Sequence, residues 1–96
     1  MRLTVDYSTL GDEIKKAINY NSRVRAVLMC VKEDLEYIEY VKRNKELDPV
    51  LDGCLHNLNM KYEDELLPLK EVVKGRKYEN LYYKILLEVE NILTIH

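Results

Sequence analysis

The sequence predicts an all-α fold, a compact bundle of about four helices within one domain covering residues 1–96. Three observations lead to this class. Leu, Glu and Lys, which favour helices, dominate the composition, and only three glycines and two prolines interrupt the chain. Hydrophobic residues make up 47% of the sequence, which is enough to bury a core. Apolar residues also recur three and four positions apart, the period of a helix with one buried face.

The chain is expected to begin with a short extended segment, because apolar and polar residues alternate in MRLTVDY, residues 1–7. A first helix follows, with Ser8 or Thr9 as its N-cap and Asp12 near its start, where a carboxylate complements the helix dipole. The helical period predicts a buried side for this helix made of Leu10, Ile14, Ala17 and Ile18.

The longest predicted helix covers about residues 22–46. Its apolar positions alternate between spacings of four and three, a pattern typical of helices that pack side by side in a bundle. The predicted seam consists of Val24, Leu28, Val31, Leu35 and Ile38, with Val27 and Val41 beside it.

A third helix is predicted to start at Asp48, as an N-cap followed by a first-turn proline, and to run antiparallel to the second. Pro68 cannot donate a backbone hydrogen bond, so this helix should be kinked or split near residues 64–68. Gly75 should cap its C-terminus. The residues predicted to share one side are Leu51, Cys54, Leu55, Leu58, Tyr62, Leu69 and Val73.

The last predicted helix covers about residues 77–94 and carries more apolar residues than one face can hold. Tyr83 and Leu87 lie one turn apart on the side opposite the expected core, so the bundle itself offers them no partner. The inward stripe is already complete with Tyr78, Leu81, Tyr82, Ile85, Val89 and Ile92.

Two other helices also carry apolar residues opposite their core sides, and Tyr and Met are enriched at protein interfaces. We therefore predict a protein-binding surface, with a homodimer through the last helix as its simplest form. The alternative is that Leu3 and Val5 of the N-terminal segment cover the last helix within one chain. The predicted interface residues are Tyr83, Leu87, Met60, Leu67 and Tyr40.

These features predict a small non-enzymatic protein-binding module, a regulator or inhibitor that occupies the surface of a partner protein. A net charge of −2 counts against general nucleic-acid binding, which normally leaves a basic excess. No catalytic, cofactor-binding or metal-binding residue is predicted. Cys54 and His56 point to different sides of a helix, and a zinc site needs further ligands. Glu33 and Glu36, or Glu36 and Glu39, have the spacing of magnesium-dependent all-α nucleotide pyrophosphatases, which makes such an enzyme the third reading.

The segment LLPLKEVVKGRKYENLYYKILLEVENIL, residues 66–93, resembles the helix-turn-helix of sigma-factor region 4 and of phage late-gene activators. The resemblance implies a DNA-binding transcriptional regulator in which residues 78–87 open the reading helix. This is the alternative function. That helix offers Glu79 and Asn80 but only one cation, Lys84, whereas helices in a DNA groove usually carry several.

The two cysteines, Cys30 and Cys54, have no signal peptide ahead of them, which indicates a reducing compartment. No apolar run approaches the length of about 18 residues that spans a bilayer. The predicted location is therefore the cytoplasm, and no membrane partner is expected.

Overall fold

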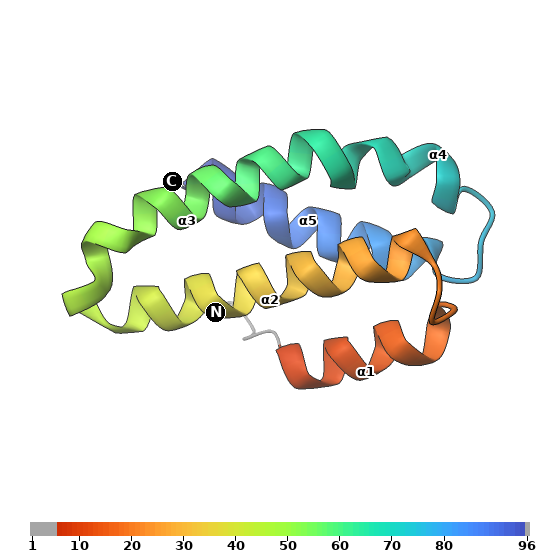
Figure 1. The fold of residues 1–96 in the computed structure, drawn as a ribbon, viewed down its shortest axis with the longest axis horizontal. Coiled ribbons are helices and arrows are strands. Elements are labelled where there is room, and N and C mark those ends of the chain that lie inside the picture. The colour runs from red at the N-terminus through yellow and green to blue at the C-terminus, as the bar shows by residue number, and fades with distance from the viewer. Residues whose placement is uncertain (1–5, 96) are drawn as a thin grey trace.

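The computed structural model describes residues 6–95 as four helical rods without a strand (Figure 1). The first two rods are α1 (Tyr7–Ala17) and α2 (Arg23–Arg43), and α5 (Glu79–Ile95) is the last. The third rod is composite and runs from α3 (Asp48–Lys61) to α4 (Lys70–Val73). Successive rods reverse direction, so the predicted antiparallel pairing of the second and third helices is confirmed (Figure 1). The all-α bundle is confirmed as well.

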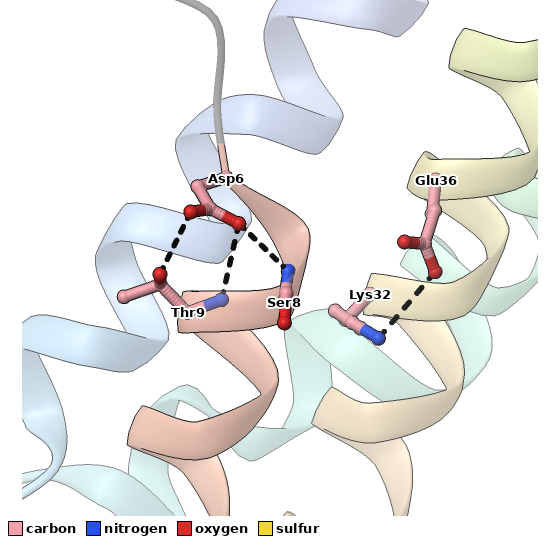
Figure 2. Close-up of polar contacts among 5 residues, drawn as sticks. All are labelled: Asp6, Ser8, Thr9, Lys32 and Glu36. Atoms are coloured by element: carbon pink, nitrogen blue, oxygen red, sulfur yellow. Dashed lines mark hydrogen bonds and ion pairs between the residues drawn. The ribbon is translucent and has the colours of Figure 1, made fainter.

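Asp6 is the N-cap of α1, so the predicted caps at Ser8 or Thr9 are wrong. One carboxylate oxygen accepts from the N–H groups of Ser8 and Thr9 at 3.1 and 3.2 Å. The other accepts from the Thr9 hydroxyl at 2.8 Å (Figure 2). A carboxylate that satisfies two orphan donors makes the stronger cap. These bonds, above all those from Thr9, lower the pKa of Asp6.

The earlier start of α1 also changes its buried side. Tyr7, expected in the extended segment, is helical and buried, whereas Ala17, expected in the core, is exposed. Gly11 is buried beside Lys32 of α2, whose Cε lies 3.4 Å from where a Cβ would stand, an ordinary van der Waals distance. Residues 1–5, which make up most of the predicted extended segment, lie outside the described residues.

Helix α2 contains the predicted seam, and all seven of its predicted apolar positions are buried. The helix ends at Arg43, three residues before the predicted end at 46. The Asn44 side chain donates to the carbonyl of Tyr40 at 2.8 Å, and its backbone N–H bonds to Val41. These bonds satisfy two carbonyls of the last turn and end the helix, and a 3-10 turn at Lys45–Leu47 leads into α3.

The third rod is interrupted near Pro68, as predicted. A π-helical turn at Tyr62–Leu66 is followed by a 3-10 turn at Leu67–Leu69, which contains the proline. The π turn inserts one extra residue and so rotates the register of everything after it. Leu66, absent from the predicted core side, is fully buried. It lies four residues after Tyr62 and three before Leu69, so the ordinary helical period also places it on that side. At the start of the rod Asp48 is already helical, and the capping position belongs to Leu47 rather than to Asp48.

The connection to α5 is a tight turn at residues 73–76. Gly75 has a φ of 77°, and the N–H of Arg76 bonds to the carbonyl of Val73 at 2.9 Å. Gly75 therefore has the left-handed conformation expected of a glycine that ends a helix. The C-cap position itself belongs to Lys74, the residue before it. Helix α5 buries Leu86 in addition to the predicted Tyr82, Ile85, Val89 and Ile92, while Tyr78 and Leu81 pack half-buried against the core.

Two glycines provide a matched test of these local conformations. Gly53 lies in α3, and a Cβ placed on it meets nothing within 4 Å. Gly53→Ala should therefore raise the free energy of unfolding by about 0.5–1 kcal/mol, because alanine loses less backbone entropy in a helix. Gly75→Ala should lower it by about 1–2 kcal/mol, because the left-handed conformation strains any residue with a Cβ. Urea denaturation measures both, and the same sign for the two variants would contradict this assignment.

Candidate interaction surfaces

The side chains of Tyr83 and Leu87 form an exposed ridge on α5, and we call these two residues the α5 ridge. Their exposed fractions are 43% and 60%, although both are large apolar side chains. Tyr83 is held in place by an edge-to-face contact with Tyr82, with 5.2 Å between ring centroids and 81° between the planes. The ridge thus presents a positioned tyrosine ring, a residue type enriched at protein interfaces, with an exposed leucine beside it.

The other three predicted interface residues lie on different rods. Tyr40 is 54% exposed on α2, where its nearest aromatic neighbour is Tyr37 at 6.2 Å between centroids. Met60 is 46% exposed on α3. Leu67 is half-buried and packs against the core, because the π turn before it rotates it inward.

The backbone just before Leu67 is bonded to α5. The hydroxyl of Tyr82 donates to the carbonyl oxygen of Leu66 at 2.5 Å, which ties the third rod to the helix that carries Tyr83. Burial raises the pKa of Tyr82 to about 12, so this hydroxyl remains a donor at neutral pH. Tyr62 makes a second link between the rods, donating to Glu90 at 2.6 Å.

Lys61 links α3 to α2 through two charged or polarisable partners. Its Nζ donates to Asp34 Oδ2 at 2.6 Å and to Cys30 Sγ at 3.0 Å. Burial lowers the pKa of Lys61, but the bonds to Asp34 and Cys30 outweigh it and raise this pKa above its ordinary value. The amine therefore stays charged and joins the two helices, a role that suits it better than nucleophilic attack. The sequence signal is the i, i+4 spacing of Cys30 and Asp34 on one helix.

A groove of about 510 Å³ separates the C-terminal half of α1 from the start of α5. Its floor is apolar and is made by Ala17, Tyr78 and Leu81. Three lysines surround the floor. One of them, Lys84 of α5, forms an ion pair at 3.8 Å with Glu13 of α1 across the groove. Sequence reasoning missed this groove because its two walls lie some sixty residues apart in the chain and only the fold brings them together.

The residues considered for metal or magnesium chemistry lie apart from these surfaces. His56 is exposed and Cys54 half-buried, and within residues 6–95 no three His, Cys, Asp or Glu side chains gather as a metal site. Glu33 and Glu36 are both exposed, and Glu36 forms an ion pair with Lys32 at 3.5 Å (Figure 2). Among the described helices, none combines the length and the apolar character needed to cross a membrane.

Comparisons of the chain with protein-family models, with curated proteins and with solved structures found no match. Residues 66–93, which resemble a helix-turn-helix, run from the end of the π turn into α5. In this segment α5 returns alongside the third rod (Figure 1). The outward side of the expected reading helix carries one cation, Lys84, together with the apolar Tyr83 and Leu87. This mixture suits contact with a protein better than contact with a phosphate-lined DNA groove.

Proposed function

We propose that this protein is a non-enzymatic binding module that regulates or inhibits a partner by covering its surface. The observation that carries the proposal is the α5 ridge. Helix α5 fills its core positions completely and still exposes Tyr83 and Leu87. Most simply, the ridge pairs with the same ridge of a second chain, since a two-fold axis lets one self-complementary patch serve both copies.

The energetics require the interface to extend beyond the α5 ridge. Burying apolar surface contributes about 25 cal/mol per Å², so a tyrosine and a leucine from each chain contribute several kcal/mol. Association itself costs on the order of 4–15 kcal/mol. Leu67, half-buried on the third rod, and Met60, exposed on α3, are the residues we propose to supply further apolar area. Glu79 and Glu90 flank the ridge on α5 and suit a polar rim.

The compartment we propose is the cytoplasm. Cys30 and Cys54 are both free thiols and both half-buried. Free thiols of this kind fit a reducing environment, where disulfides rarely persist.

The test is a pair of charge substitutions on the α5 ridge, Tyr83→Lys with Leu87→Glu. The wild type is expected to sediment as a dimer at high micromolar concentration, and the double variant as a monomer, because two charges would be buried in the interface. Far-UV circular dichroism and the cooperativity of melting should be retained, since both side chains are exposed in the single chain. The melting temperature should fall, because dissociation removes the stabilisation that association adds.

A matched control applies the same chemistry to an exposed tyrosine and an exposed valine elsewhere. Tyr37→Lys with Val50→Glu changes side chains that are 48% and 43% exposed on α2 and α3. This control should remain dimeric. A wild type that is monomeric at high micromolar concentration, or a control that dissociates as readily as the ridge variant, would show that the α5 ridge is not a self-association surface.

A further inference from the structure

We infer that the groove between α1 and α5 binds an acidic amphipathic helix of a partner protein. This inference rests on the proposed function, because it assigns a class of partner to a protein-binding module. It concerns a surface separate from the α5 ridge, and the two can be tested independently. The groove measures about 510 Å³.

The floor of the groove suits apolar side chains. Tyr78 and Leu81 are half-buried and pack against the core from below, while Ala17 is exposed on the α1 side. A helix that lays its apolar face into a groove presents side chains four positions apart, and an apolar floor flanked by two helices receives such a pair.

The rim of the groove suits carboxylates. Lys16, Lys77 and Lys84 line it, and the one carboxylate of the lining is Glu13. Glu13 lies 3.8 Å from Lys84, with both side chains about half exposed at 44% and 55%, so this pair is weak. A carboxylate of the partner can compete with Glu13 for Lys84 at little cost.

The fold gathers further cations around the groove. Residues 15–25 and 74–84 carry eight Lys or Arg and one Glu, which makes these two segments +7 in a chain of net charge −2. Both segments lie at the same end of the bundle, because they connect antiparallel rods (Figure 1, right). The rest of the chain therefore carries −9, and the molecule has one basic end. Such an end attracts an acidic partner and orients it toward the groove.

A protein segment fits this site better than a nucleic acid does. Phosphates would meet the lysines, but nothing along a phosphate backbone would cover the apolar floor formed by Tyr78 and Leu81. The surrounding excess of −9 would also repel a long polyanion that continued past the basic end. A short acidic helix satisfies the floor and the rim at once.

The probe is a labelled designed helix of about 18 residues, long enough to form in water, with leucines four apart and flanking glutamates. Titrated against the full chain, it should shift the amide NMR signals of Ala17, Leu81 and Lys84. Binding should weaken as salt rises from about 50 to about 500 mM. Lys16→Glu with Lys84→Glu should weaken the affinity about tenfold or more.

The matched control is Lys42→Glu with Lys45→Glu, the same change of charge on two exposed lysines, one in the last turn of α2 and one in the 3-10 turn after it. It should reduce the affinity by less than about threefold, because screening weakens distant charges. An equal loss in both double variants would overturn the inference by showing that only net charge matters. So would a polyglutamate peptide without leucines that binds as tightly, or duplex DNA that binds the same residues more tightly than the helix.

The α5 ridge variant separates this inference from the proposed self-association. Tyr83→Lys with Leu87→Glu should bind the acidic helix with unchanged affinity, because neither residue lines the groove. Loss of binding in this variant would assign the helix to the ridge and overturn the groove. A monomeric wild type that still binds the helix at Ala17 and Leu81 would contradict ridge dimerisation and support the groove.

Discussion

Leu35→Ala should lower the free energy of unfolding by about 2–5 kcal/mol. Leu35 is fully buried in the middle of α2, the helix that contacts α1, α3 and α5. Truncation removes apolar contacts with several rods at once and leaves a cavity that rigid neighbouring helices fill only in part. Chemical denaturation with urea, followed by circular dichroism, measures the change.

The neighbouring Glu36 is the control for Leu35. It is exposed, and its ion pair with Lys32 at 3.5 Å is a surface contact of little energetic value. Glu36→Ala should therefore change the stability by no more than about 0.5 kcal/mol. A loss below about 1 kcal/mol for Leu35→Ala would mean that α2 is not the centre of the core.

Tyr82→Phe should lower the free energy of unfolding by about 1–3 kcal/mol, although it removes a single oxygen. The Tyr82 side chain is fully buried, and its hydroxyl bonds to the carbonyl of Leu66 at the end of the π turn. Without the hydroxyl this buried carbonyl faces an apolar ring and loses one of the bonds that its two lone pairs can accept. Thermal and urea denaturation of the variant check the expected loss.

The same bond predicts how the difference between wild type and Tyr82→Phe depends on pH. Burial raises the pKa of Tyr82 from 10.0 to about 12. A phenol whose pKa is higher in the folded state contributes stability that is complete below the unfolded pKa and is lost as pH rises through the folded pKa. The difference between the two proteins should therefore shrink above about pH 10. A difference that stayed constant to pH 12 would contradict the buried bond.

Tyr62→Phe is the control for Tyr82→Phe. Tyr62 also donates one hydroxyl bond, to Glu90, but both residues line a hollow open to solvent. Water can replace the lost donor there, so the stability should fall by no more than about 1 kcal/mol. Equal losses of stability in the two tyrosine variants would show that the bond to Leu66 contributes no more than the bond to Glu90.

The sequence by itself determined where the helices run and which sides of them are buried. The alternating spacings from Val24 to Val41 predict the buried stripe of α2 directly, because apolar residues at this period all lie on one side of a helix. Pro68 and Gly75 act through their own covalent chemistry, the missing N–H and the missing Cβ, so their effects appear in any context. The exposure of Tyr83 and Leu87 followed from the same periodicity.

The tertiary structure decided everything that depends on which helices are neighbours. The π turn shifts the register, so Leu67 turns inward, against a count of 3.6 residues per turn. The bond from Tyr82 to Leu66 joins two rods through residues that are sixteen positions apart in the sequence. Likewise, the groove between α1 and α5 and its basic rim arise only when antiparallel rods bring two distant connections to one end. A helical pattern records the angle of each side chain around its own axis and holds no information about the neighbour on the other side.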